Sequence, residues 1–571
     1  MGTQLLLLGV FPLYLIHFIL FFSPGLFLAV FVIQNQKIDR FYIVLLSILI
    51  SALIGYLTFW VYLLNQYAGI GLSSLIVLAS IYCFASPKLR LFLKNQLTAD
   101  IVFPLLLIFF VGLFYLSILG IFGSSEVPLE TLVRTTFFHG FPHDNSLPRI
   151  FAEKLYAGRD PRDLGAGWLS SDRPPLQTGL TLVQRPIMAF GAKVHYPILA
   201  TIAQCSWIAS IWTLCRVIRL SGKRIALVLA FSIFSGFFLF NSIYVWPKLL
   251  AAALAVFAFS LLLQAVCESR RPTSTEFVLA VVAAAAALLS HGGVIFTLPA
   301  FALLLARPQS FPGIRFILLG CAVFGLLIAP WTAYQKFYNP PGDRLVKWHL
   351  AGVSEIDTRS SWQAISDSYH DISIEQIASN KWQNFKVLFG KQSSDKDPFY
   401  RKRETEFFYT FKGLGILNLG WLIILLAPLA KVPLTKRIHR FNNLLKLASN
   451  ELKAARLMLG VSLVSLLFWV MVMFGPATTI IHQGSYATMM LLVTGLALLI
   501  SGLTRFLTYF LLSLQIISFA VIWVFTIPPI ALDAPPPGLN VGMMALAIAA
   551  LVGIIKILHR LSHQKFTQVE P

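Results

Sequence analysis

Residues 101–121 read IVFPLLLIFFVGLFYLSILGI and contain no charged side chain. Because a helix rises about 1.5 Å per residue, about 20 apolar residues are long enough to cross the hydrocarbon of a bilayer. Residues 457–474 and 506–527 have the same character. Over all 571 residues, 57% are hydrophobic and 12% are charged, compared with roughly 25% charged in soluble domains. The sequence therefore predicts an all-α polytopic integral membrane protein.

About fifteen candidate spans follow when the other apolar stretches are delimited in the same way. Their approximate bounds are 5–33, 42–64, 69–86, 102–122, 197–218, 224–242, 247–267, 276–290, 292–306, 314–333, 412–430, 457–475, 485–501, 504–527 and 540–559. Alternating the sides of these spans places most basic clusters on one face, which is predicted to be cytoplasmic because cytoplasmic loops are rich in Lys and Arg. The N-terminus is then outside and the C-terminus is in the cytoplasm.

The formal net charge of +21 is distributed in short clusters between the apolar stretches. This pattern is typical of membrane topology, so we expect membrane lipids and no nucleic acid as partners. Two long segments, 123–196 and 335–411, fall on the predicted external face and are expected to carry short surface helices. The predicted organisation is three extra N-terminal spans in 1–100, a core with the first external loop in 101–334, the second external loop in 335–411, and C-terminal spans in 412–571.

The first external segment contains HDNSLPRIFAEKLYAG at 143–158 and SDRPPL at 171–176. From Leu147 to Ala157, apolar residues recur at helical spacing with charged residues between them. This pattern predicts an amphipathic helix that lies on the membrane surface.

These residues resemble the first external loop of the GT-C glycosyltransferases, especially the protein-mannosyltransferase-like branch and the lipid A aminoarabinose transferases. That loop has an acidic motif just after a transmembrane helix, then a surface helix, then a basic residue before Pro-Pro-Leu. The residues that match are Asp144, Ala152, Leu155, Gly158, Arg173, Pro174, Pro175 and Leu176. The resemblance is local, and Asn145 stands where the family usually has a second acid.

The resemblance implies a GT-C-like fold and a glycosyltransferase that takes a sugar from a polyprenyl-phosphate donor on the external or periplasmic face. It also implies a place in the bacterial inner membrane and a hydroxyl acceptor on a cell-envelope glycan, lipid or protein. The lipid-linked sugar is a substrate, and no further cofactor is expected with certainty. A divalent metal is left open because the second acid of the motif is missing.

Such a transfer needs a base, because the acceptor hydroxyl loses its proton as it attacks the anomeric carbon. Asp144 is the candidate general base. The pattern Asp-Asn-Ser before an apolar-periodic stretch is also a helix N-capping signal, so a structural capping role is the alternative.

The leaving group would be an anionic lipid phosphate, which a cation on the same face can stabilise. Lys248 is a candidate because it is the single basic residue in the short loops of the predicted external face. The other candidates for donor or phosphate binding are Arg173, Arg344, Lys347 and His349. The alternative for these residues is an ordinary cluster of interfacial charges or, for Lys248, a lysine anchored at an aromatic belt.

Further polar residues predicted at this face are candidates for lining a pocket with Asp144. They are His143, Asp172, His291, His482 and Tyr486. The alternative for the histidines is a solvated residue or a turn residue whose side chain is satisfied locally.

Two other classes of membrane protein compete with the transferase. A transporter or flippase should carry ionisable residues within its spans and often two related halves, whereas Asp and Glu are nearly absent from the predicted spans. A ligase or polymerase of the O-antigen type also has large external loops, but it favours a loop centred on Arg and His. The sequence contains no Gly-rich phosphate loop, no His-Glu-x-x-His motif and no Gly-x-Ser-x-Gly motif, which argues against ATP hydrolysis and zinc proteolysis.

Overall fold

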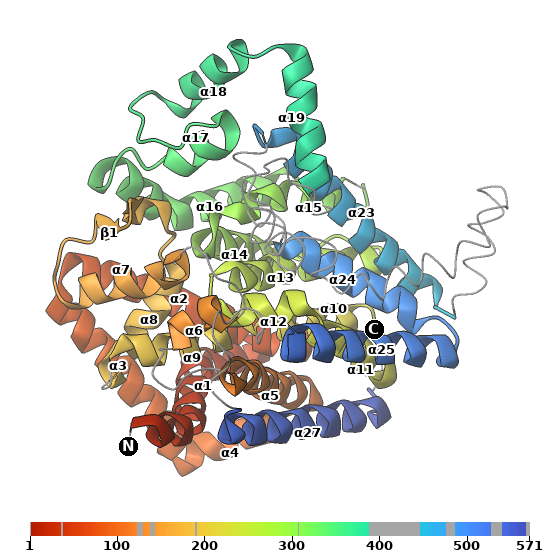
Figure 1. The fold of residues 1–571 in the computed structure, drawn as a ribbon. Coiled ribbons are helices and arrows are strands. Elements are labelled where there is room, and N and C mark those ends of the chain that lie inside the picture. The colour runs from red at the N-terminus through yellow and green to blue at the C-terminus, as the bar shows by residue number, and fades with distance from the viewer. Residues whose placement is uncertain are drawn as a thin grey trace, which may run out of the picture.

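The computed structural model describes residues 2–35, 38–122, 129–136, 143–188, 191–306, 308–387, 446–475, 486–526 and 539–566. These residues form helices, with one two-stranded antiparallel sheet (Figure 1). In the first half the helices are α1 Gly2–Asn35, α2 Ile43–Leu64, α3 Gln66–Ala85, α4 Pro87–Gln96, α5 Ala99–Ile121, α6 Leu129–Thr136, α7 Leu147–Tyr156, α8 Leu176–Gln184, α9 Ala192–Gln204, α10 Trp207–Val217, α11 Gly222–Ile233, α12 Gly236–Ile243 and α13 Lys248–Cys267.

The later helices are α14 Ser274–Ser290, α15 Leu298–Leu305, α16 Ile314–Ala333, α17 Arg344–Ala351, α18 Ser361–His370, α19 Ile374–Val387, α23 Ser449–Val472, α24 Tyr486–Ser501, α25 Arg505–Phe519 and α27 Val541–His563. Short 3-10 or π segments are η1 Arg40–Tyr42, η2 His143–Ser146, η3 Ser170–Asp172, η4 Arg185–Ile187, η5 Gly292–Phe296, η6 Tyr334–Tyr338 and η10 Ala520–Thr526. The strands are β1 Asp163–Gly165 and β2 Trp168–Leu169.

Within the described residues, 10 helices are long and apolar enough to cross a membrane, or up to 11 if the pair α11 and α12, bent by 63°, is one span. The predicted spans 276–290, 292–306 and 485–501 correspond to the shorter apolar helices Ser274–Ser290, Gly292–Leu305 and Tyr486–Ser501. The predicted span 412–430 lies outside the described residues. The all-α, many-span architecture is confirmed, while the number of fifteen crossings stays a prediction.

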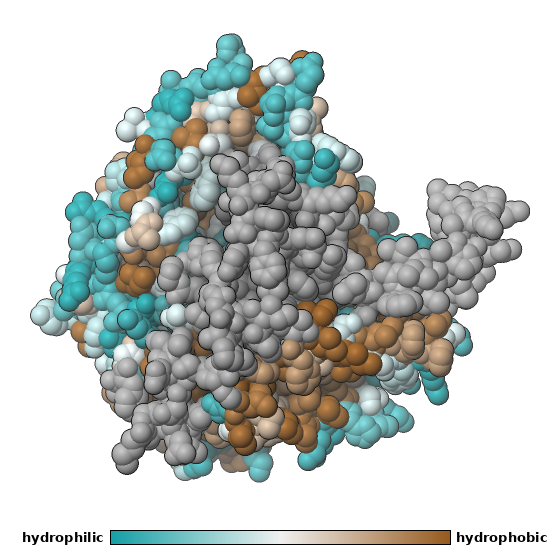
Figure 2. All heavy atoms as spheres, viewed as in Figure 1, coloured by the Kyte–Doolittle hydropathy of each residue, from teal (hydrophilic) through white to brown (hydrophobic). Residues whose placement is uncertain are grey.

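The outer surface of the helices explains why the protein needs a bilayer. Large apolar side chains are exposed along α3, α16, α25 and α27. Soluble proteins rarely expose so large an apolar surface to water. Figure 2 shows hydrophobic residues gathered over the region of α25, and hydrophilic residues over α17–α19. Helices satisfy their own backbone hydrogen bonds, so an apolar exterior of this kind is suited to lipid.

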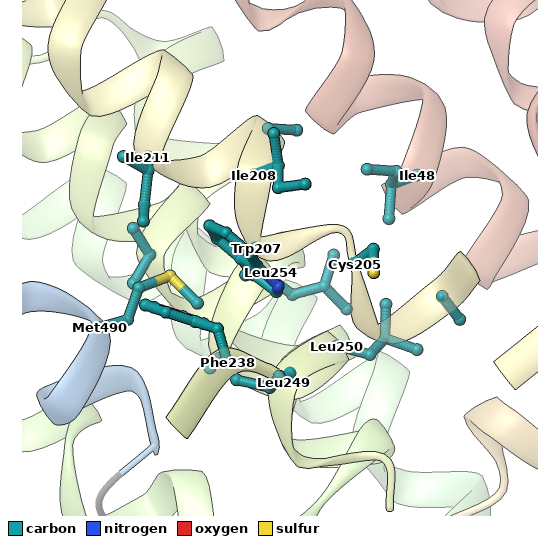
Figure 3. Close-up of a cluster of buried hydrophobic side chains, with 14 of the residues drawn as sticks. Ile48, Cys205, Trp207, Ile208, Ile211, Phe238, Leu249, Leu250, Leu254 and Met490 are labelled. Atoms are coloured by element: carbon teal, nitrogen blue, oxygen red, sulfur yellow. The ribbon is translucent and has the colours of Figure 1, made fainter. Parts of the chain in front are cut away.

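The interior is centred on α13, whose residues are buried over nearly its whole length. Alanines along α13 let neighbouring helices approach closely, as small residues do in membrane bundles. Figure 3 shows side chains of α2, α10, α12, α13 and α24 meeting in this core, where Trp207 stacks on Phe238 with ring centroids 4.1 Å apart. The close packing fixes where α13 begins, and therefore where Lys248 lies.

Charged side chains gather at one end of the bundle, where α5, α11, α14 and α23 begin. The ion pairs there are Arg216–Asp100, Arg224–Glu451 and Arg270–Glu276. Lys453 donates to the carbonyl of Val266 at the end of α13, 3.0 Å away. We call this the basic end. It contains clusters that the sequence predicts to be cytoplasmic.

The other end contains the first long segment. Helix α5 begins at the basic end and finishes at Ile121, whose carbonyl accepts a hydrogen bond from Asn540 just before α27. Helix α13 begins at this end, and α14 finishes there, because Ser290 Oγ donates to the carbonyl of Pro247 at 3.1 Å. The segments η2, α7, β1, β2 and α8 fold over it, as does α17. We call it the Asp144 end.

The predicted amphipathic helix is present as α7, but its apolar face is covered by protein. Phe151 is fully buried and packs edge-to-face on Phe59 of α2, with centroids 5.2 Å apart. Leu147 and Leu155 are buried on the same face. The helix therefore docks on the bundle through this face, and its position at the membrane surface stays a prediction.

Candidate active site

Asp144 lies in η2, two residues before the N-cap of α7. Its carboxylate does not cap the helix: Ser146 occupies the N-cap position of α7. One carboxylate oxygen, Oδ1, accepts a hydrogen bond from Trp246 Nε1 at 2.7 Å, and Oδ2 forms an ion pair with Arg173 at 3.3 Å. The side chain is only 11% exposed. The capping alternative is therefore not what the geometry shows.

Trp246 reaches Asp144 because of an unusual turn between α12 and α13. Val245 has φ of +59°, a left-handed conformation that costs a β-branched residue on the order of 1–3 kcal/mol. Its carbonyl accepts hydrogen bonds from Gln177 Nε2 at 2.8 Å and from Tyr196 Oη at 3.4 Å. Gln204 accepts from the backbone N–H groups that open α13 and donates to Gln177 Oε1. This buried polar network holds the strained turn in place.

Lys248 is the first residue of α13 and is 4% exposed. Its Nζ lies 3.5 Å from the centroid of the Trp246 ring and 5.4 Å from that of Tyr486, which are cation–π distances. Among the described residues, no hydrogen bond or ion pair is recorded for this ammonium group. It is close enough to Asp144 and Arg173 to interact electrostatically with both. A buried cation that makes no hydrogen bond or ion pair among the described residues is suited to receiving an anion.

Arg173 and Arg344 lie on the ring of Trp168, which the β1–β2 hairpin presents. Their guanidinium carbons are 4.0 Å and 5.6 Å from its centroid. Arg344 also forms an ion pair with Asp172 at 3.4 Å. Burial raises the pKa of the Asp172 carboxyl above its usual value, and the charges of Arg173 and Arg344 oppose this effect. Two predicted donor-binding cations thus lie beside a second, buried acid.

Lys347 and His349 are both buried on α17. Lys347 is already engaged, because its Nζ pairs with Asp343 Oδ1 at 2.9 Å and donates to the Asp357 carbonyl at 2.6 Å. His349 stacks on Trp348, with centroids 5.3 Å apart. The contacts of Lys347 with Asp343 and Asp357 are of the kind that stabilise the fold. Its predicted role in donor binding stays a prediction.

His291 and Tyr486 complete the wall of the cluster. His291 Nδ1 accepts a hydrogen bond from the Gly293 N–H at 3.1 Å, so the histidine also caps η5. Lys248, Arg173 and His349 lie near enough to act on it electrostatically. Tyr486 Oη donates to Asn241 Oδ1 at 2.7 Å, which fixes the ring facing Lys248.

The structure thus brings together most of the predicted residues from well-separated parts of the chain. Those in or beside the cluster are Asp144, Asp172, Arg173, Lys248, His291, Arg344, His349 and Tyr486. His482 lies outside the described residues, and so does the side chain of His143. Sequence reasoning missed Trp246 and Trp168. The only sequence signal for Trp246 was its position two residues before the candidate cation Lys248.

Within the part of the chain that the structure describes, no group of three or more His, Cys, Asp or Glu side chains is arranged to hold a metal ion. Asp144 and Asp172 each pair with an arginine. Chemically, the cluster offers a carboxylate that can take a proton and a buried ammonium group that can balance a negative charge.

Comparison of the chain with protein-family models gives no match. Curated proteins and solved structures give no significant match either.

Proposed function

We propose that this protein is a membrane glycosyltransferase of the GT-C type, which moves a sugar from a polyprenyl-phosphate donor to a hydroxyl acceptor. The observation that carries the proposal is that a buried carboxylate, Asp144, and a buried ammonium group, Lys248, both contact the side chain of Trp246. A transfer from a lipid phosphate needs both charges at the same place. The local resemblance at 143–176 supports the same class.

In this mechanism the acceptor oxygen forms a bond to the anomeric carbon, and the bond from that carbon to the phosphate oxygen breaks. The electron pair of the broken bond leaves with the polyprenyl phosphate. Asp144 takes the acceptor's hydroxyl proton, and Lys248 balances the negative charge that grows on the phosphate. Arg173 forms an ion pair with Asp144, with 3.3 Å between the guanidinium nitrogen and the carboxylate oxygen. This pair would orient the carboxylate toward the acceptor.

The proposal places the Asp144 end on the external face of a bacterial inner membrane, with a cell-envelope glycan, lipid or protein as acceptor. The basic end is then cytoplasmic. The experiment that tests the function is the conversion of a glycosyl polyprenyl phosphate to free polyprenyl phosphate by purified protein.

Cysteine labelling tests this orientation. Thr358→Cys, at an exposed position near α17, should react with an impermeant maleimide added outside intact cells. Ser274→Cys, exposed at the start of α14 on the basic end, should react only after permeabilisation. The background is a variant with Cys83, Cys267 and Cys321 replaced by Ala, since these are the cysteines that are not fully buried. The reverse labelling pattern would overturn the orientation and the external reaction with it.

A transporter or flippase is the second candidate, and one observation favours it. His17 of α1 and His195 of α9 are buried and joined by a 2.8 Å hydrogen bond, and His17 also bonds Gln184 at 2.6 Å. Ionisable side chains inside spans often mark transport or proton paths. A transporter would move the glycosyl lipid from one leaflet of a vesicle membrane to the other without changing it chemically, whereas the transferase consumes it.

A further inference from the structure

Trp246 contacts the two opposite charges of the site through two different parts of one side chain. The indole N–H donates to Asp144 Oδ1 at 2.7 Å, and the ring face lies 3.5 Å from Lys248 Nζ. The ring itself is 2% exposed and packs edge-to-face on Tyr244 at 4.4 Å. The indole therefore contacts both charges, the carboxylate at its N–H edge and the ammonium group over its face.

Such an arrangement has a clear electrostatic consequence. In a buried environment a carboxylate and an ammonium group attract each other strongly, and they would pair directly if neither were held by another partner. In a direct ion pair, Asp144 would be less able to accept a proton and Lys248 less able to bind the phosphate. The indole gives each charge a partner without cancelling it, since an N–H bond stabilises the carboxylate and a π-face stabilises the ammonium group.

We propose that Trp246 is a positioning residue, which holds Asp144 at its N–H edge and Lys248 over its ring face and so keeps each in its active orientation. This inference rests on the proposed transferase function. The strained φ of Val245 supports it, because the strain is maintained by a dedicated network of Gln177, Gln204 and Tyr196 directly before Trp246. Strain that the surrounding structure holds in place is typical of functional sites.

The chain contains a matched contact that serves as a control. Trp212 Nε1 donates to Asp100 Oδ1 at 3.1 Å, and Asp100 pairs with Arg216 at 2.7 Å. This is the same Trp–Asp–Arg arrangement as Trp246–Asp144–Arg173, and Trp212 is equally buried. The Trp212–Asp100 contact lies at the basic end, where Asp100 stands in the first turn of α5. Asp144 comes after the opposite end of that helix. Removing either indole N–H should therefore have similar effects on folding.

The test compares Trp246→Phe with Trp212→Phe in purified full-length protein. Trp246→Phe keeps an aromatic face for Lys248 but removes the hydrogen bond to Asp144. We expect kcat to fall roughly tenfold to a hundredfold, the loss typical of one hydrogen bond to a charged group, with the donor KM nearly unchanged. The acid limb of the pH–rate profile should move to higher pH, because the ionised base has lost a donor. Trp212→Phe should keep the wild-type kcat and pH profile.

A third variant, Trp246→Leu, removes the ring as well and lets the two charges pair directly. Binding of a short-chain polyprenyl phosphate, measured by thermal stabilisation, should then weaken relative to Trp246→Phe and Trp212→Phe. This readout needs no sugar transfer. If wild type turns over no sugar, the proposed function fails, and the binding series alone decides the positioning role.

Two results would overturn the inference. One is a wild-type kcat and pH profile in Trp246→Phe. The other is an equal drop in melting temperature and activity in Trp246→Phe and Trp212→Phe, which would reduce both contacts to structural ones.

Discussion

Asp144→Asn is expected to lower the turnover number for sugar transfer roughly 10²- to 10⁴-fold, the range associated with loss of a general base. Asparagine keeps the shape of the side chain, and its carbonyl oxygen can still accept the Trp246 N–H. It cannot accept the hydroxyl proton. The ion pair with Arg173 is also lost, so the melting temperature should be measured beside the transfer rate.

Glu130→Gln is the matched control for this substitution. Glu130 is a buried acid in α6, at the same end of the bundle, and it forms two hydrogen bonds with Arg149 at 2.6 Å and 3.0 Å. Losing that pair should reduce stability to a similar or greater extent and leave the turnover number close to wild type. A folded Asp144→Asn variant with near-normal turnover would move the base elsewhere, first to Asp172.

Lys248→Met is expected to lower kcat/KM for the lipid-phosphate donor roughly 10²- to 10³-fold, comparable to losing one stabilising group for a developing anion. Methionine has a similar length and no charge. The side chain is 4% exposed, and among the described residues its ammonium group makes cation–π contacts but no hydrogen bond or ion pair, so burying its charge opposes folding. We therefore expect the melting temperature to stay the same or to rise.

This combination of outcomes distinguishes a functional lysine from an anchor. Lys453→Met, which removes the cation that bonds the Val266 carbonyl at the basic end, should lose stability and keep the donor kinetics. Unchanged donor kinetics in Lys248→Met, or a fall in melting temperature that accounts for the lost activity, would make Lys248 an interface residue.

Composition and periodicity predict the helical architecture because span length is set by the bilayer. The stretch 101–121 falls within α5, and the stretch 457–474 covers the later part of α23 and runs just past its end at Val472. The sequence did not reveal that the predicted span 224–242 is two helices, because no proline marks the break near Ser235 and Gly236. In the structure the Trp523 ring packs directly against the backbone of Gly236, where a Cβ atom would clash with it.

The sequence indicated charged residues of the candidate site, but it did not indicate the contacts that hold them in place. Asp144 was selected through the local resemblance at 143–176, and Lys248 stood out as an exception in the charge pattern. The role of Trp246 depends on the positive φ of Val245, which is held by residues far away in the sequence and leaves no local signal. The amphipathic pattern of α7 was correct for a helix, but periodicity cannot tell a protein-covered face from a lipid-covered one.

Mass-spectrometric analysis of a glycosyl polyprenyl phosphate, incubated with the purified protein in liposomes, tests the central claim most directly. Wild type should release free polyprenyl phosphate and transfer the sugar to a hydroxyl acceptor, tested across a panel of donor sugars and acceptors. Asp144→Asn, reconstituted at the same level, should release almost none. Recovery of every donor chemically intact from folded wild type, above all with the donor moved to the opposite leaflet, would contradict the transferase and favour a transporter.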